Sequence, residues 1–362
     1  MPRITRQAGV KGSRTFTPDE YFAKWTRGEI APPQDDNDFP RFIFESFDLP
    51  KDDDYHYRAT AVVTLSQVQR YLQFGAKGGL LAWYRDDEGN EIQPHPPAAD
   101  IQAYAAIFQP NTSTFKALTS LRSNASKGSI RAVVAVHLQS CHRAHVSLPS
   151  PRTKMHTNPY LDLWTWTSLA LDWAGPTPTT SKVKTSHALL PILYHHFGCL
   201  APSYEALALI QKTARGRRVL DCGSGTGYWT YMLRRMSNPN VEVLPLDNGL
   251  SDWRTMWIGD TVATDCVEFL KQNRGGTSDV LMLVYPNTMD DFTARVIQAY
   301  KGTTIVYAGT QDDSGFTGFK RERIVEWMAR EMTAWELSCQ IPLPSFAGRD
   351  EAFFIYEKIK RI

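Results

Sequence analysis

Residues 219–230 read VLDCGSGTGYWT, and the prediction of the fold starts from this stretch. An apolar run carries Asp221, and three glycines then alternate with Ser224 and Thr226 before helix-forming residues resume at Tyr228. A strand that turns tightly into a helix needs glycine, which adopts backbone angles that other residues avoid and lets a ligand approach the backbone. The free N–H groups at the start of the next helix point at such a ligand. The stretch therefore predicts a ligand-binding loop.

Strands and helices alternate around this loop. Helices are predicted near 188–197, over 204–214 with Ser203 as the cap, and from about Tyr228, Asp265, Met289 and Gly318. Strands are predicted over 217–222, 241–247, 261–264, 279–286 and 303–309. The last two strands, 335–343 and 351–358, have no helix between them. The pattern predicts an α/β fold with a doubly wound, mostly parallel sheet that ends in an antiparallel hairpin.

The glycine spacing and one acid indicate which ligand binds. The loop has the spacing G-x-G-x-G, whereas the dinucleotide fingerprint would place its third glycine at position 228, which is Tyr228. Asp247 ends the second strand, 26 residues after Asp221, where a carboxylate can accept hydrogen bonds from both ribose hydroxyls. The glycine spacing therefore disfavours NAD, while Asp247 still indicates a ligand that contains ribose.

These features resemble the class I S-adenosylmethionine-dependent methyltransferases over about residues 188–362, and a closing hairpin is characteristic of that family rather than of dehydrogenases. The resemblance implies S-adenosylmethionine as the cofactor, with Asp221 near its methionine amine and Asp265 near its adenine. Asp260 competes for the adenine position. The predicted cofactor site comprises Asp221, Gly223, Ser224, Gly225, Gly227, Asp247 and Asp265.

The resemblance also places the methyl acceptor beside the fourth strand, which ends in Val284-Tyr285-Pro286-Asn287. Methyltransferases that act on the amino group of adenine carry an Asn or Asp, two prolines and an aromatic residue there, so the sequence disfavours base methylation. Transfer from a sulfonium depends mainly on positioning, and a base is needed only if the acceptor keeps its proton until attack. The predicted catalytic residues are His195, His196, Tyr285 and Asn287, with Asp312 as a further residue that could orient the acceptor.

The first 187 residues have a less regular pattern, and 362 residues suit two domains. We expect an irregular α+β region over 1–187, disordered at its start, that covers the site or docks the acceptor, and a methyltransferase domain over 188–362. The Pro- and Thr-rich segment 174–187 is the predicted linker. The expected elements are a helix from Thr17-Pro18, a loop over 31–54, a strand leading into a helix over 59–76, a strand over 128–142 and an aromatic helix over 159–173.

Charge is uneven although the net charge is only +2. Residues 101–187 hold nine Lys and Arg against two acids, and no acid occurs between Asp100 and Asp162. A basic block can bind nucleic acid. The basic residues are not clustered among aromatic ones, however, so a solvated connector or a segment of spurious origin is the simpler interpretation.

The remaining composition limits the other classes of site. Five scattered cysteines without a C-x-x-C pair indicate no disulfide framework, and we expect a reducing compartment, the cytoplasm, with nucleus and mitochondrion left open. His137, Cys141, His142 and His145 do not follow a zinc pattern, so no metal is expected. No apolar run is long enough to cross a bilayer.

The sequence therefore predicts a methyltransferase that acts on a small molecule. Two alternatives stay open: an RNA or protein methyltransferase, supported only by the basic block, and a methyltransferase-like binding module without turnover. An NAD enzyme is a distant third. The sequence names neither the acceptor nor the methylated atom, and it does not indicate the oligomeric state.

Overall fold

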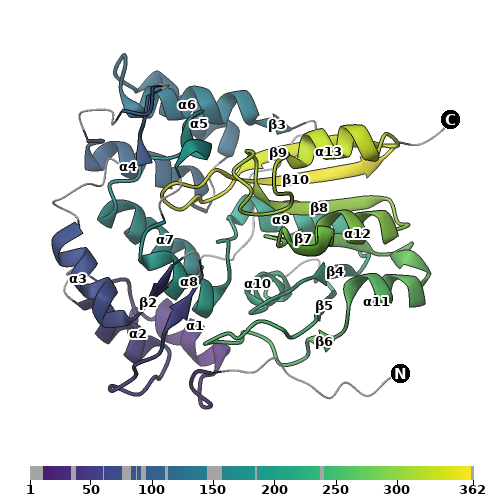
Figure 1. The fold of residues 1–362 in the computed structure, drawn as a ribbon, viewed down its shortest axis with the longest axis horizontal. Helices are drawn as coiled ribbons and strands as arrows, with labels where there is room; N and C mark the ends of the chain where they lie inside the picture. Colours follow the sequence, from purple (N-terminus) through teal and green to yellow (C-terminus); the bar gives the residue numbers. More distant parts are fainter. Residues whose placement is uncertain are drawn as a thin grey trace.

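An eight-stranded sheet forms the centre of the computed structural model (Figure 1). The structure describes residues 11–33, 38–59, 61–75, 83–86, 88–90, 95–110, 113–144, 157–183, 186–236 and 240–359. The strand order is β3-β9-β10-β8-β7-β4-β5-β6. The strands are β3 (Arg143–Ala144), β4 (Val219–Cys222), β5 (Val243–Asp247), β6 (Val262–Ala263), β7 (Val280–Val284), β8 (Thr304–Thr310), β9 (Trp335–Pro342) and β10 (Glu351–Lys358).

Strand directions confirm the predicted fold class. β4 pairs in parallel with β5 and β7, and β6 and β8 extend the parallel run on either side. β10 is antiparallel to both β8 and β9, so the last two strands form the expected hairpin. The short strand β3 adds to the free edge of β9 and comes from the N-terminal region.

Helices cover both faces of the sheet, as the alternation of strands and helices requires. On one face, apolar side chains of the sheet pack against α11, α12 and α13. On the other face they pack against α9, α10 and the N-terminal region. These helices are α8 (Leu189–Phe197), α9 (Tyr204–Ala214), α10 (Tyr228–Arg234), α11 (Cys266–Gln272), α12 (Phe292–Ala299) and α13 (Ile324–Glu331). The last helix begins after Arg323 rather than near Gly318.

The N-terminal region is mainly helical where it is described. Its elements are α1 (Pro18–Thr26), α2 (Phe39–Ser46), β1 (Tyr57–Arg58), β2 (Val62–Val63), α3 (Leu65–Gly75), α4 (Ala98–Ala105), α5 (Thr114–Ser123), α6 (Ile130–Cys141) and α7 (Pro159–Ala170). The helices predicted from Thr17-Pro18 and over 159–173 are confirmed, as is the strand-to-helix segment over 59–76.

Two predictions for this region are wrong. The expected loop over 31–54 contains helix α2, and the expected strand over 128–142 is helix α6. Ser129 caps α6 by accepting the Ala132 amide, and its buried residues Ile130, Val134 and Leu138 recur every four positions. Helical spacing and a cap therefore outweigh the β-branched residues that suggested a strand. The basic segment is helical over α5 and α6, so the connector interpretation is wrong there.

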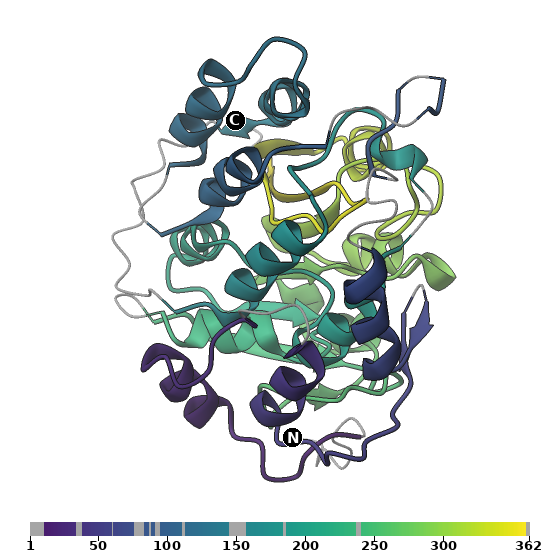
Figure 2. The ribbon, with the colours of Figure 1, turned by 90° about the vertical axis from the view of Figure 1, so that its left-hand side faces the viewer.

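The N-terminal region covers the edge of the sheet where the parallel strands end, and in Figure 2 its helices lie in front of the sheet. Trp164 and Trp173 each donate their indole N–H to the carbonyl of Ser345, in the turn between β9 and β10. One hydrophobic core runs from α1 to β10. Ala174 and Val183, inside the predicted linker, are buried in this core. The segment up to residue 183 therefore packs, and the division at residue 187 stays a prediction.

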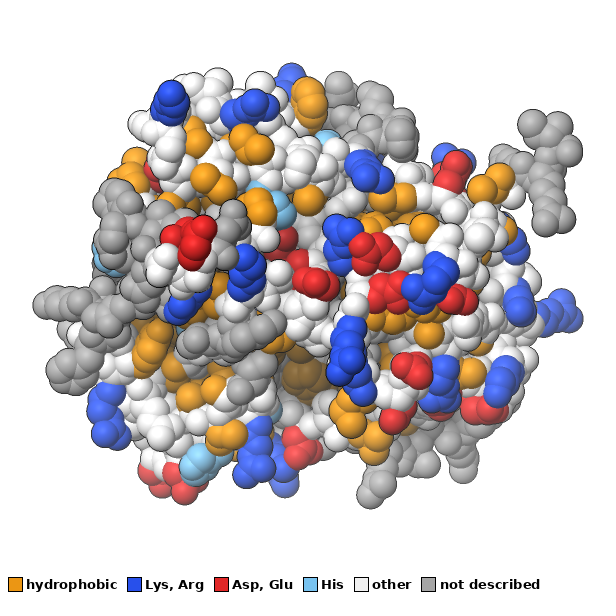
Figure 3. All heavy atoms as spheres, turned by 45° about the horizontal axis from the view of Figure 1, so that its top comes forward, with side chains coloured by type: hydrophobic (Ala, Val, Ile, Leu, Met, Phe, Trp, Pro, Cys, Tyr) orange, Lys and Arg blue, Asp and Glu red, His pale blue; other side chains and the backbone are white. Residues whose placement is uncertain are grey.

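The surface carries no strong charge signal on the face seen in Figure 3, where basic and acidic side chains are interspersed. Arg131 of the basic segment pairs with Asp100, and Arg122 donates to Gln139. Over the described ranges, no helix is both long and apolar enough to cross a membrane.

Candidate functional site

The glycine loop joins β4 to α10 in the way the sequence predicts. Gly223, Gly225 and Gly227 have φ angles of +82°, +55° and +78°, a region that residues with a side chain rarely adopt. The amides of Gly223 and Ser224 donate to the carbonyl of Leu246 at 2.8 and 3.0 Å, which ties the turn to the neighbouring strand β5. The turn therefore depends on glycine and is held in place by the sheet.

A cleft of about 230 Å³ opens over this loop, at the carboxyl ends of β4, β5 and β7. Most of the predicted site residues line it: Asp221, Gly223, Ser224, Gly225, Asp247, Asp265, Tyr285 and Asn287. Ligand pockets usually measure about 300–1,000 Å³. A ligand the size of a nucleoside cofactor would therefore require side chains around the cleft to move.

Asp221 has an unusual environment at the base of this cleft. Its carboxylate is 1% exposed, and Oδ2 accepts a hydrogen bond from Thr230 at 2.6 Å. Oδ1 has no hydrogen-bond partner in the part of the chain that is described. Burial raises the pKa of Asp221 to about 7. Buried polar atoms are nearly always bonded, so Oδ1 indicates a missing partner, and a cationic N–H donor of a ligand satisfies it best.

The two other predicted acids occupy the expected strand ends. Asp247 Oδ2 accepts the Gly225 amide at 3.0 Å, and its Oδ1 accepts the Gly249 amide at 2.8 Å. Asp265 caps α11, because its Oδ1 accepts the amides of Val267 and Glu268. Each carboxylate has lone pairs beyond these bonds.

Of the two candidates for the adenine position, only one faces the cleft. Asp265 lines it, whereas Asp260 forms an ion pair with Arg234 at 2.8 Å and is not among the lining residues. A carboxylate already paired with an arginine has little need of a further partner. The structure therefore favours Asp265 over Asp260.

The sheet order, the antiparallel last strand and the cleft at the carboxyl edge decide the fold. It is a class I methyltransferase-like fold. No family model matches the chain, and no curated protein matches it.

Solved structures of methyltransferases resemble this methyltransferase-like fold. The Burkholderia thailandensis 1,6-didemethyltoxoflavin-N1-methyltransferase, with S-adenosylhomocysteine bound, is 16% identical over 43% of this chain and 77% of its own, with a TM-score of 0.30. The magnesium protoporphyrin IX methyltransferase of Synechocystis PCC 6803, also with S-adenosylhomocysteine, is 10% identical over 72% of this chain and 99% of its own, with a TM-score of 0.29. At TM-scores of 0.30 and 0.29 these matches carry no conclusion about this chain, and its fold follows from its own strand order.

Tyr285 and Asn287, which the sequence predicts to border the methyl acceptor, line the cleft at the carboxyl end of β7. Tyr285 has a φ of +49°, and its amide donates to Ala308 at 2.7 Å. Its hydroxyl accepts from the hydroxyl of Tyr194 at 3.5 Å, and burial raises the Tyr285 pKa well above its usual range. Asn287 Oδ1 accepts the amide of Met289. A strained backbone at a strand end often marks a functional position.

The structure does not bring the two predicted histidines to the cleft. His196 is fully buried, with Nδ1 2.7 Å from Thr255 Oγ1 and Nε2 3.0 Å from the hydroxyl of Tyr57. His195 Nε2 lies 2.8 Å from the carbonyl oxygen of Arg58. Burial lowers the pKa of both rings. Both histidines therefore hold strand β1 against α8, a contact that the sequence does not reveal.

Two further predicted residues, Gly227 and Asp312, also lie outside the cleft lining. A side chain on Gly227 would overlap Ile258, so this glycine serves packing at the start of α10. Asp312 is half-buried near Asp350 in the loop after β8. His137 Nε2 lies 2.8 Å from Asp350 Oδ2, and no group of three possible metal ligands occurs among the residues described. His145 lies outside the described residues.

Several residues that line the cleft were missed. Trp253 lies beside the glycine loop, 3.2 Å from the position that a Gly225 Cβ would take, and its indole nitrogen is buried without a partner in the described structure. Cys199 and Phe292 also line the cleft. Trp253 is in the irregular segment between β5 and β6, where no periodic pattern marks a residue as functional.

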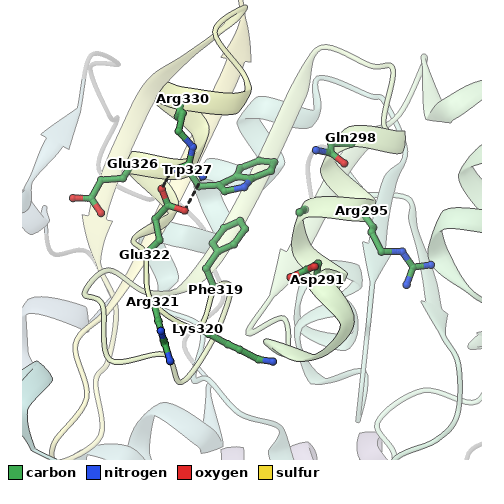
Figure 4. Close-up of a pocket in the computed structure, with 11 residues that line it drawn as sticks. Asp291, Arg295, Gln298, Phe319, Lys320, Arg321, Glu322, Glu326, Trp327 and Arg330 are labelled. Carbon is green, nitrogen blue, oxygen red and sulfur yellow. Dashed lines mark hydrogen bonds and ion pairs between the residues drawn. The ribbon is translucent and has the colours of Figure 1, made fainter.

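A larger, open hollow of about 810 Å³ lies between α12 and α13, away from the cleft (Figure 4). Phe319 and Trp327 stack there with ring centroids 4.9 Å apart and belong to the core on that face. Arg330 at its rim forms an ion pair with Glu322. The aromatic side chains of this hollow support the packing of α13, and no residue of the glycine loop borders the hollow.

Proposed function

We propose that the protein is an S-adenosylmethionine-dependent methyltransferase that acts on a small molecule. The observation that carries this proposal is the unpartnered, buried oxygen of Asp221 at the base of the glycine-loop cleft. The cofactor's ammonium group provides the cationic donor that this oxygen lacks. Asp247, at the end of the adjacent strand, then accepts bonds from the ribose hydroxyls, and Asp265 lies toward the adenine.

The bound cofactor supplies an electrophilic methyl group on a sulfonium. The protein's own residues hold the two reactants in line and keep water out. Tyr285 and Asn287 border the acceptor side of the cleft. Neither histidine lines it, so we propose positioning rather than proton removal by a histidine as the main contribution.

A small acceptor is supported by the cover over the site. The helices of the N-terminal region lie across the carboxyl edge of the sheet, and the cleft beneath them is narrow. A folded RNA or protein segment would have to displace them, whereas a small molecule enters through side-chain movement.

Calorimetry with S-adenosylhomocysteine and with NAD tests the cofactor. We expect binding of S-adenosylhomocysteine and none of NAD, and tight NAD binding without a response to S-adenosylhomocysteine would overturn the proposal. A comparison of metabolites between knockout and wild-type cells then identifies the acceptor. The methylated product, which is heavier than the acceptor by one CH2, should be absent from the knockout cells. Cofactor binding without any such species would indicate a binding module.

Replacing Asp221 by asparagine should separate stability from cofactor binding. The folded protein keeps the Asp221 proton up to about pH 7, whereas the unfolded chain releases it near pH 3.8. The free energy of unfolding therefore falls as pH rises from about 4 to 7, and this loss is complete above pH 7. At pH 8, Asp221→Asn should raise the free energy of unfolding by about 1–3 kcal/mol and weaken S-adenosylhomocysteine binding at least about tenfold.

Asp279→Asn is the matched control for this change, since Asp279 is buried but paired with Arg218 at 3.1 Å. Urea titrations at pH 8 should show that this variant is destabilised. If Asp221→Asn is destabilised as well and keeps full affinity, Asp221 is an ordinary structural acid.

Asn287→Ala and Tyr285→Phe should lower turnover of the identified acceptor by roughly tenfold or more while cofactor affinity stays within about twofold, because both side chains lie on the acceptor side. Asn273→Ala is the control, since Asn273 ends α11 away from the cleft. Steady-state kinetics and calorimetry provide the two readouts. Full turnover in both variants would place the reaction elsewhere.

A further inference from the structure

Three polar side chains form a buried cluster near the carboxyl end of β8: His187, Arg349 and Glu351. Their exposed fractions are 0%, 1% and 2%. Several of their polar atoms have no partner within the described residues, namely both ring nitrogens of His187, Nε and Nη1 of Arg349 and Oε2 of Glu351. Buried polar atoms are rarely left unbonded, and so many together indicate a partner that the described residues do not supply.

Arg349 is the centre of this cluster. Its Nη2 donates to Ser186 Oγ at 2.8 Å, and its guanidinium carbon lies 3.3 Å from the centre of the Phe316 ring. Among the described residues, no ion pair joins it to a carboxylate. A buried arginine without a counter-ion is strongly destabilising. A purely structural arginine would be expected to use more of its five N–H donors.

The charges around Arg349 leave it uncompensated at neutral pH. Burial raises the pKa of Glu351 to about 8, so this carboxyl holds its proton, and burial lowers the pKa of His187 to about 3, so this ring is neutral. Both carboxylate oxygens of Asp350 already have partners. Oδ2 lies 2.8 Å from His137 Nε2, and Oδ1 accepts a hydrogen bond from Gln311 Nε2 at 2.6 Å. The cluster therefore presents one positive charge.

The cluster lies next to the acceptor side of the cleft. Tyr285 and Cys199 line the cleft, and both are close enough to Glu351 for its charge to raise their pKa. The positive charge of Arg349 lowers the pKa of Tyr285, so Arg349 also lies near this tyrosine. The aromatic rings of Phe316 and Phe346 pack against Arg349 and His187. Arg349 itself is buried and does not line the cleft, so an acceptor beside Tyr285 reaches this cation only when the side chains between them move.

We propose that Arg349 binds a carboxylate of the methyl acceptor, which makes the substrate a small, singly charged organic acid. This inference rests on the proposed function. A carboxylate fits better than a phosphate, because one cation balances one negative charge and the nearby Asp312, whose pKa of about 6 leaves it ionised at neutral pH, would repel a dianion more strongly. Tyr285 and Phe316 are the side chains that must move to admit it.

Isothermal titration of the full chain saturated with S-adenosylhomocysteine tests the inference. The probes are benzoate, phenylacetate and octanoate as carboxylates, phenyl phosphate as the phosphate, and benzamide as an uncharged analogue of benzoate. We expect at least one carboxylate to bind and benzamide not to bind. Arg349→Gln should weaken that binding about tenfold or more and leave the affinity for S-adenosylhomocysteine within about twofold.

Two further variants keep the test decisive. Arg349→Lys retains the charge and should bind the carboxylate about two- to tenfold more weakly than the wild type. This variant replaces Arg349→Gln in the test if Arg349→Gln does not fold. Arg321→Gln, an exposed arginine, should change nothing. If none of the carboxylates binds the wild type, or if one binds Arg349→Gln as tightly as the wild type, the inference is overturned. Tighter Arg349-dependent binding of phenyl phosphate overturns the carboxylate assignment. If the wild-type protein does not bind S-adenosylhomocysteine, the proposed function itself is refuted.

The acceptor itself gives an independent measurement. In the metabolite comparison, the species whose methylated form disappears from knockout cells should carry a carboxylate. A neutral or cationic acceptor would overturn the inference while leaving the methyltransferase proposal intact.

Discussion

Residues 186–362 expressed alone should fail to fold into a stable monomer. The N-terminal region contributes aromatic side chains to the core that this fragment would expose. Phe22 packs edge-on against Trp257 with centroids 5.7 Å apart, and Tyr160 stacks on Phe197 at 4.6 Å. Each large apolar side chain that loses its cover costs about 1.5–3 kcal/mol, so a few of them exceed the usual 5–15 kcal/mol of a folded domain.

Expression, circular dichroism and dye binding to exposed apolar surface measure this outcome. Co-expression of residues 1–183 with 186–362 is the matched control and should restore solubility, because it supplies the same core in two pieces. A fragment that unfolds cooperatively and binds S-adenosylhomocysteine with full affinity would show that the N-terminal region is a detachable lid.

Gly225→Val should abolish cofactor binding. Gly225 has a φ of +55°, and a Cβ there would lie 3.2 Å from the ring of Trp253, within the cleft. A branched side chain strains the backbone by about 1–3 kcal/mol and occupies the space where the ligand approaches the loop. We expect affinity for S-adenosylhomocysteine to fall at least about a hundredfold, which corresponds to roughly 2.7 kcal/mol.

Gly216→Val separates the two effects of this change. Gly216 has a φ of +80° with no atom near the position of its Cβ, and it does not line the cleft. It should show a similar loss of stability in thermal unfolding and no loss of affinity in calorimetry. Equal affinity losses in both variants would mean that strain, and not the cleft, explains Gly225→Val.

Part of this molecule follows from local sequence patterns. The glycine loop needs positive φ angles, which glycine adopts readily because it has no side chain. The alternation of strands and helices over 217–309 sets the sheet and the helices that cover it. Asp221 and Asp247 follow too, since the carboxyl ends of adjacent parallel strands meet at one edge of the sheet. These features depend on residues close together in the chain.

The tertiary structure alone decided which side chains meet at the site. His195 and His196 precede the core in sequence, yet contacts with Tyr57 and Arg58, about 139 positions away, turn them from the cleft. Trp253 and the cluster of His187, Arg349 and Glu351 have no local signal, because long-range packing brings them together. Local sequence patterns are therefore enough to predict the glycine loop and the parallel sheet around it. Packing between distant segments places the N-terminal helices over the cleft and sets which other side chains line it, since those contacts depend on the whole fold.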